Sequence, residues 1–195
     1  MASESDTAYL SAVSLLDLYR RRELSPVEAT RLILDRLDAL QPRINAFCVV
    51  DRDGALAAAR ASEERWLRGE AVGRLDGVPV TIKDLILMRG FPTRRGSRLV
   101  EPDQDWSEDA PATARLREAG AVIIGKTTTP EFGWKALGDS PLTGITAIPG
   151  TSRARPAAAA REPRRPAPPG SGRCMSAAMV QARSASPAPL PASSG

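Results

Sequence analysis

Apolar positions recur with two different periods along the first 146 residues of the chain. Between Pro26 and Leu40 they recur every three to four residues, whereas from Val78 to Ile82 they alternate with other residue types. The first spacing is typical of an amphipathic helix, and the second is typical of a strand with one buried face. The pattern therefore predicts helices and strands within one domain.

Local signals mark the ends of several helices. Ser25, Pro26 and Glu28 have the spacing of an N-cap, a first helical position and the third position of a capping box. Pro42 is expected to end this helix, because proline lacks the N–H that continues the helical ladder. Further helices are expected at residues 14–20, at 53–67 with Gly69 as the end, at 109–120 with Ala112, Leu116 and Ala119 facing inward, and after the capping signal Thr129-Pro130-Glu131.

Short apolar runs predict strands at residues 46–50, 78–83 and 121–126. The run at 121–126 is too short for a helix and does not alternate, which is typical of a strand buried on both faces of a parallel sheet. Helices and strands follow one another in turn, so we expect an α/β fold with a parallel or mixed sheet. Cys48, in the first run, is expected to be a small buried hydrophobe.

The composition excludes several kinds of chemistry. The 195 residues include no histidine, which excludes Ser-His-Asp and Cys-His catalysis and every His-containing metal site. The two cysteines, Cys48 and Cys174, lack the spacing of a zinc-binding pair, so no metal and no cofactor are expected. The amino terminus is polar, and no apolar run is as long as a signal sequence or a membrane span. A soluble cytoplasmic protein without membrane contact is therefore expected.

The net charge of +4 comes from the carboxy-terminal part of the chain. Residues 147–195 contain seven arginines and one acid, a net of +6, which leaves 20 basic and 22 acidic groups, a net of −2, in residues 1–146. The carboxy-terminal part is rich in Arg, Ala and Pro and has no aromatic residue. Such a composition predicts a disordered tail, because it cannot bury enough apolar surface to fold.

Lys83 is the candidate catalytic residue. It ends the alternating strand, and the chain has three lysines (Lys83, Lys126 and Lys135) against 24 arginines. A desolvated lysine loses its proton readily, whereas arginine stays charged, so a buried Lys83 would be able to act as a general base. The alternative interpretation is that Lys83 reaches water at the strand end and pairs with Asp84.

Four motifs in this order make the chain resemble the amidase signature family: residues 77–84 (GVPVTIKD), 121–126 (AVIIGK), 129–133 (TPEFG) and 139–146 (DSPLTGIT). The resemblance covers residues 14–146 and implies part of that family's fold, a mixed, largely parallel sheet flanked by helices. It also implies hydrolysis of a carboxamide C–N bond in a small-molecule amide, or ammonia transfer, by a Ser-Ser-Lys triad. Lys83 would be the triad lysine, and backbone N–H groups of a glycine-rich loop would hold the oxyanion.

The two serine-bearing elements of the family, GGSSGG and GSD-x-G-G-S, are missing downstream of residue 146. Reading the codons from each third base permits RNPW and RT within residues 147–155, and PGGSSAGA from residue 156 onward. It permits HVGSDGAG from residues 174–182, where the glycine across Met179 and Val180 is forced because methionine has one codon. We therefore hypothesise that residues 1–146 are the N-terminal part of an amidase domain and that residues 147–195 are translated out of frame.

This interpretation predicts an amidase-family chain that is inactive as written, because its serines are missing. One alternative is a non-enzymatic remnant, and another is a protein that binds RNA or another polyanion through the arginines of the tail. The tail has no stacking aromatics, so no specific nucleic-acid partner is expected. Within the family, the role of an amidotransferase subunit working on charged tRNA remains open.

Several other side chains are interpreted as structural. Glu131 and Asp139 are explained by a helix cap and a turn, and Ser140 and Thr143 by a loop. Trp106 and Trp134 are expected to be packing residues. Because strands from both sides of residue 146 build the family's sheet, residues 1–146 are expected to expose apolar edges and to aggregate.

Overall fold

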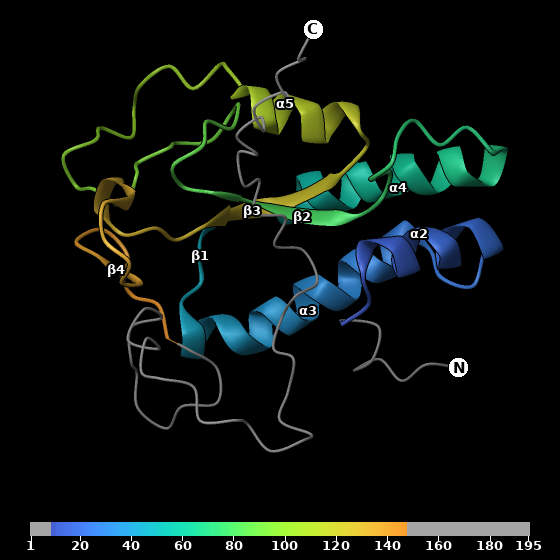
Figure 1. Ribbon diagram of the computed structural model, residues 1–195, viewed down its shortest axis with the longest axis horizontal. Coiled ribbons are helices and arrows are strands. Elements are labelled where there is room, and N and C mark those ends of the chain that lie inside the picture. Colours follow the sequence, from blue (N-terminus) through green and yellow to red (C-terminus); the bar gives the residue numbers. More distant parts are fainter. Residues whose placement is uncertain (1–8, 148–195) are drawn as a thin grey trace, which may run out of the picture.

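A computed structural model of the chain describes residues 9–147 (Figure 1). The expectations for residues 1–8 and for 148–195, including the disordered tail, lie outside this range. The helices and strands, in chain order, are α2 (Ala12–Arg21), α3 (Pro26–Ile44), β1 (Phe47–Val50), α4 (Arg52–Arg68), β2 (Pro79–Lys83), α5 (Pro111–Glu118), β3 (Val122–Thr127), the 3₁₀ turn η1 (Glu131–Gly133), β4 (Asp139–Ser140) and β5 (Gly144–Ile145).

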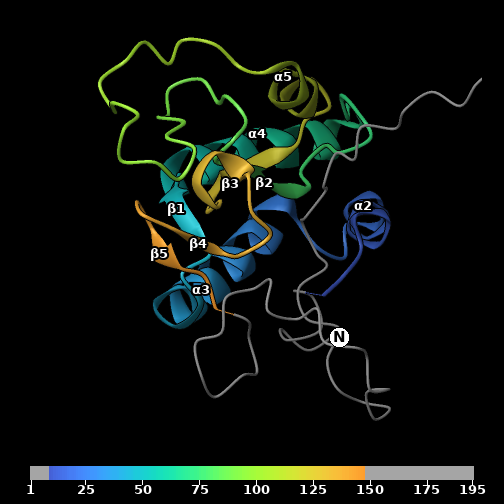
Figure 2. The ribbon, with the colours of Figure 1, turned by 60° about the vertical axis from the view of Figure 1, so that its left-hand side comes forward.

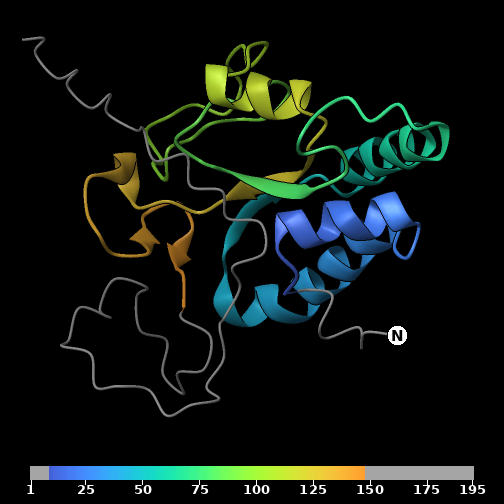
Figure 3. The same cartoon turned by 45° about the vertical axis from the view of Figure 1, so that its right-hand side comes forward.

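The described residues form an α/β fold around a mixed sheet. The strand order is β1-β3-β2, with β1 antiparallel and β2 parallel to β3. Strands β4 and β5 form a separate antiparallel pair. Helices α3 and α4 pack against Val122 and Ile124 of β3, whereas α5 packs on the side of Ile123. Figures 1 and 3 show α3 and α5 on opposite sides of β2 and β3. The α/β prediction with a mixed sheet is confirmed.

Strand β3 is the centre of the core, because all six of its residues are buried. Val122 and Ile124 pack against α3 and α4, whereas Ile123 packs with the apolar residues of β2. Alternate residues of a strand point to opposite faces, so this division places β3 between two layers. The prediction of a strand buried on both faces is confirmed.

Gly125 lets β1 approach β3 closely. A Cβ atom at this position would lie 2.2 Å from the carbonyl oxygen of Val49 in β1. The register of β2 against β3 also shifts between Val80 and Thr81, opposite this part of β3. Any side chain at Gly125 would therefore push β1 away from the sheet.

The N-terminus of α3 has the predicted capping box. The backbone N–H of Glu28 donates to Ser25 Oγ at 3.1 Å, and the backbone N–H of Ser25 donates to Glu28 Oε2 at 2.8 Å. The prediction that Pro42 ends this helix is wrong, since α3 continues to Ile44. The end is set instead by Asn45, whose left-handed backbone lets its N–H donate to the carbonyl oxygen of Gln41.

Three further predictions from the pattern are wrong in detail. In α5, Ala112 is exposed and Thr113 is buried, because Thr113 Oγ1 donates to the carbonyl oxygen of Leu87 at 2.7 Å. The signal at residues 129–131 starts only the three-residue turn η1. Phe132 has a φ of 48°, which is incompatible with a right-handed helix, so no longer helix forms. Cys48 is half-buried rather than buried, because β1 lies at the edge of the sheet.

Trp134 is not a packing residue within the described chain, because 86% of its surface is exposed. Trp106 is half-buried, and its Nε1 donates to the carbonyl oxygen of Pro102 at 2.7 Å. No helix between residues 9 and 147 is both long and apolar enough to cross a membrane.

Candidate functional site

Lys83 lies at the carboxyl end of β2, paired with Thr127 of β3. Val80 and Ile82 before it are buried, whereas Lys83 is half-buried. The chain turns directly afterwards, where the N–H of Ile86 donates to the carbonyl oxygen of Lys83 at 2.9 Å. Lys83 therefore ends β2 at the border of the buried core.

The predicted pairing of Lys83 with Asp84 is wrong, because Asp84 pairs with Lys126. Lys126 Nζ lies 3.0 Å from Asp84 Oδ1, and both side chains are almost fully enclosed, at 0% and 3% exposure. The ion pairs found within residues 9–147 include those of Lys126 and Lys135 but none of Lys83. Asp84 thus turns inward and leaves the ammonium group of Lys83 without a carboxylate at this position.

The ion pair extends into a small hydrogen-bonded cluster. Lys126 Nζ also donates to the carbonyl oxygen of Pro92 at 2.9 Å and to Thr93 Oγ1. The second carboxylate oxygen of Asp84 accepts from the N–H of Gly96 at 3.2 Å. Burial lowers the pKa of Lys126, and the neighbouring carboxylate of Asp84 opposes that change. The cluster joins β2 and β3 to the loop at residues 92–97.

A second set of contacts joins this loop to the segment after β3. Ser97 Oγ donates to Glu131 Oε1 at 2.7 Å, and the N–H of Phe132 donates to the carbonyl oxygen of Arg95 at 2.8 Å. Gly96 is required between them, since a Cβ there would lie 2.5 Å from the carbonyl oxygen of Thr129. Glu131 therefore holds a loop rather than capping a helix.

The segment at residues 135–146 is held by its own polar contacts. Lys135 Nζ pairs with Asp139 Oδ2 at 2.7 Å, and Ser140 Oγ accepts from the N–H of Thr143 at 3.0 Å. Thr146 Oγ1 donates to the carbonyl oxygen of Asn45 at 2.9 Å. Thr143 lies in the turn between β4 and β5, whereas Asp139 and Ser140 form the short strand β4 rather than a turn and a loop.

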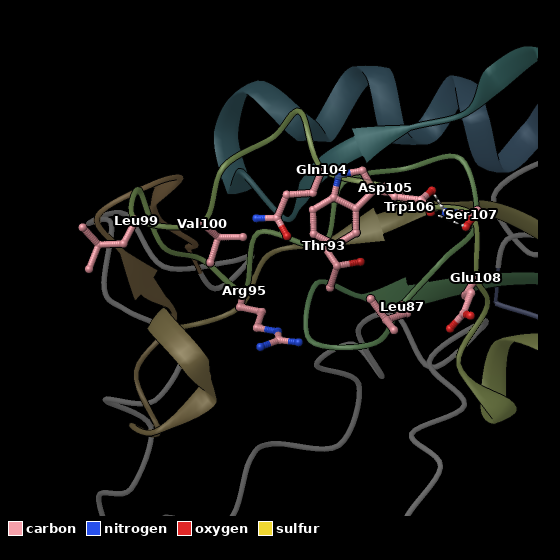
Figure 4. Close-up of a pocket in the computed structure, with 10 residues that line it drawn as sticks. All are labelled: Leu87, Thr93, Arg95, Leu99, Val100, Gln104, Asp105, Trp106, Ser107 and Glu108. Atoms are coloured by element: carbon pink, nitrogen blue, oxygen red, sulfur yellow. Dashed lines mark hydrogen bonds between the residues drawn. The ribbon is translucent and has the colours of Figure 1, made fainter.

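A cavity of about 450 Å³ lies beside the cluster, within the long connection between β2 and α5. Thr93, which accepts from Lys126, forms part of its wall, and Lys83 does not line it (Figure 4). The lining is mixed, with Leu87, Thr93, Arg95, Leu99, Val100, Gln104, Asp105, Trp106, Ser107 and Glu108. Among the residues that the structure describes, no cluster of His, Cys, Asp or Glu is suited to a metal ion.

Sequence reasoning missed Lys126 as part of this region. The residue stands at the polar end of an apolar run, and nothing local indicates that its side chain is fully buried. The one signal was the rarity of lysine in this chain, which applies to Lys126 as much as to Lys83. Its partners come from elements distant in the sequence, so only the fold brings them together.

Known proteins resemble this chain in sequence. A family model described as Amidase matches residues 28–157. A glutamyl-tRNA(Gln) amidotransferase subunit of Acidothermus cellulolyticus is 44% identical over 138 residues, which are 70% of this chain and 26% of that protein. Indoleacetamide hydrolase of Bradyrhizobium diazoefficiens is 39% identical over 141 residues, 71% of this chain and 26% of that protein. The chain thus spans about a quarter of the length of these relatives.

Solved structures show the same likeness. A crystal structure of an amidase superposes with a TM-score of 0.65 at 34% identity, covering 71% of this chain and 31% of that one. The native peptide amidase of Stenotrophomonas maltophilia gives a TM-score of 0.65 at 29% identity and covers 72% of this chain and 30% of that one. A bacterial aryl acylamidase of the amidase signature family gives a TM-score of 0.67 at 27% identity and covers 73% of this chain and 30% of that one.

Proposed function

Since the chain belongs to the amidase signature family, we propose that it carries the lysine-bearing part of an active site that cleaves carboxamide C–N bonds. The observation that carries this proposal is the position of Lys83. Lys83 is half-buried at the end of β2, beside the fully buried strand β3. The adjacent Asp84 forms an ion pair with Lys126 instead. An amine in this position, with no carboxylate of its own among the described residues, is free to hydrogen-bond to a serine hydroxyl of the complete site.

In the proposed mechanism Lys83 acts through serine hydroxyls. It takes a proton from a bridging serine, which in turn activates the serine that attacks the amide carbonyl. Residues 1–146 contain neither of the serine-bearing motifs of the family. The remaining 49 residues, which are rich in Arg, Ala and Pro, also lack both motifs. Loss of a nucleophile in a serine hydrolase lowers kcat about a millionfold, so we expect no amide hydrolysis by the chain as written.

We further propose that residues 147–195 are read out of frame from an amidase gene. The support is that the possible codons of residues 147–182 permit both serine motifs, in order, in one alternative frame. Sequencing the coding DNA across the codons of Thr146 and Ala147 tests this proposal. An open frame through both motifs is expected once one base is restored, and stop codons directly after that point would refute it.

The catalytic role of Lys83 is tested in the protein expressed from the restored frame. Lys83→Ala should abolish hydrolysis of a panel of aliphatic, aryl and peptide amides, because the triad then has no proton acceptor. Lys135→Ala is the matched control, since Lys135 lies in a partly exposed ion pair with Asp139. Hydrolysis that survives Lys83→Ala at the parent rate would contradict the assignment.

A second candidate within the family is an amidotransferase subunit that works on charged tRNA. The relatives named as subunits of glutamyl-tRNA(Gln) amidotransferase, at 39–44% identity, favour it. This candidate predicts that the restored protein supports amidation of glutamyl-tRNA(Gln), whereas a hydrolase would cleave simple aryl or aliphatic amides. Efficient hydrolysis of such amides without any amidation of the tRNA would exclude the subunit role.

A further inference from the structure

A buried ion pair between two strands contributes little net stability. Taking both charges out of water costs about as much as their attraction returns, so an apolar pair of similar size is often equally stable. What such a pair supplies is a fixed geometry, because each charged atom demands its own partner. Lys126 and Asp84 satisfy this demand with contacts to Pro92, Thr93 and Gly96.

We propose that Lys126 and Asp84 are positioning residues that hold Lys83 in a single direction at the end of β2. They do so by anchoring the turn after Lys83 to β3 and to the loop at residues 92–97. The proposal gives a role to a cluster that the triad chemistry does not use. Its functional meaning rests on the proposed role of Lys83, whereas the contacts themselves do not depend on that role.

The backbone geometry supports this role. The N–H of Asp84 donates to the carbonyl oxygen of Thr127 at 3.0 Å, and both carboxylate oxygens of Asp84 have partners on its inner side. Successive side chains of an extended chain point to opposite faces. With Asp84 fixed toward the interior, Lys83 is directed away from it. The pairing of the Lys83 backbone with Thr127 of β3 fixes the strand on the other side of this turn.

Charge gives the same cluster a second effect on Lys83. As long as Lys126 neutralises Asp84, the carboxylate attracts the preceding residue, Lys83, only weakly. Without Lys126, Asp84 would be a buried and unpaired charge, which is strongly unfavourable. Lys83 is the adjacent residue in the chain, and its flexible side chain would turn toward Asp84. Lys126 is therefore expected to keep Lys83 and Asp84 apart.

Competitive acetylation of the full chain tests this role without any turnover. A trace of acetic anhydride modifies neutral, accessible amines, and mass spectrometry of peptides gives the ratio of modification at Lys83 to that at Lys135. Lys126→Met should lower this ratio severalfold, because Lys83 becomes ion-paired and protected. Adding Asp84→Asn to this variant should restore the ratio, because the attracting charge is gone. A purely structural role predicts no such rescue.

Arg117→Met is the matched control, since it removes the ion pair with Asp109 at 2.9 Å without touching the cluster. It should leave the ratio unchanged. An unchanged ratio in a Lys126→Met variant that keeps the circular dichroism of the parent would overturn the proposal. Should that variant fail to fold, Lys126→Gln keeps the N–H donors without the charge, and its ratio decides in the same way. Failure here leaves the amidase proposal standing, because no hydrolysis is measured.

Discussion

At the residue scale, the position of one carboxylate decides how Lys83 is interpreted. Lys83 and Asp84 are adjacent in the sequence, so pairing between them was a reasonable expectation. The structure instead gives Asp84 to Lys126, a residue of the next strand in space. The reason is direction: in an extended chain the side chains of two neighbours point to opposite faces, and the side chain of Asp84 points to the face where that of Lys126 is buried.

Cys48 provides a residue-scale prediction about reactivity. Burial, followed by the negative charge of Asp84, raises the pKa of its thiol to about 11, against an ordinary value of 9.0. The thiolate is the reactive form, so Cys48 should react with iodoacetamide about 100-fold more slowly near pH 7.5 than an unperturbed thiol. The rate should increase as the pH rises toward 11.

The measurement is peptide-resolved alkylation of Cys48 as a function of pH. The control is the same chain in concentrated urea, where burial is lost and the rate at pH 7.5 should rise. Equal rates in the native and the denatured chain would show that the thiol is not shielded by the sheet.

At the element scale, helix starts were predictable and helix faces were less so. The capping box of α3 lies within four consecutive residues, Ser25 to Glu28, and its two hydrogen bonds form as expected. The inward face of α5 was misjudged at Ala112 because Thr113 is drawn inward by the carbonyl oxygen of Leu87. A cap depends on local geometry, whereas the buried side of a short helix depends on its neighbours.

Ser25→Ala tests the contribution of the capping box to stability. The substitution removes the acceptor of the Glu28 N–H and should lower the free energy of unfolding by about 1 kcal/mol. The midpoint of urea unfolding measures this loss. Glu28→Gln is the control, because glutamine still accepts from the Ser25 N–H and should change the midpoint little. Equal midpoints for Ser25→Ala and the parent would contradict the prediction.

At the scale of the whole molecule, large apolar side chains are exposed on one segment. Phe132, Trp134, Leu137 and Ile145 are 50%, 86%, 40% and 49% exposed. Figure 2 shows the part of the chain that carries them beside the sheet, near the carboxyl ends of β2 and β3. Exposed apolar surface of this kind promotes association.

Aggregation of the chain is therefore a prediction at this scale. A double variant, Phe132→Ser with Trp134→Ser, should reduce light scattering and the binding of the dye ANS, because it removes both exposed aromatic side chains of residues 132–145. Leu67→Ser, at the end of α4 and 59% exposed in the parent, is the control and should change both signals less. An equal effect of the control variant would assign the association to general hydrophobicity instead.

Strand order marks the limit of sequence reasoning for the whole fold. The alternation of helices and strands predicted an α/β fold, and a parallel or mixed sheet was expected. The antiparallel direction of β1 follows from the path of α3 and of the chain around Asn45, which returns β1 against β3. No local period encodes such a path, because it depends on how α3 packs against α4 and β3.

By itself, the sequence determined the kinds of element, the start of α3, the burial of β3 on both faces and the choice of Lys83 as candidate. Each of these depends on residue type and on spacing within one or two helical turns. Only the tertiary structure decided that Asp84 belongs to Lys126, that the loop at residues 92–97 is held by both, and that Trp134 is exposed. These features depend on contacts between distant parts of the chain, which form only when packing brings their elements together.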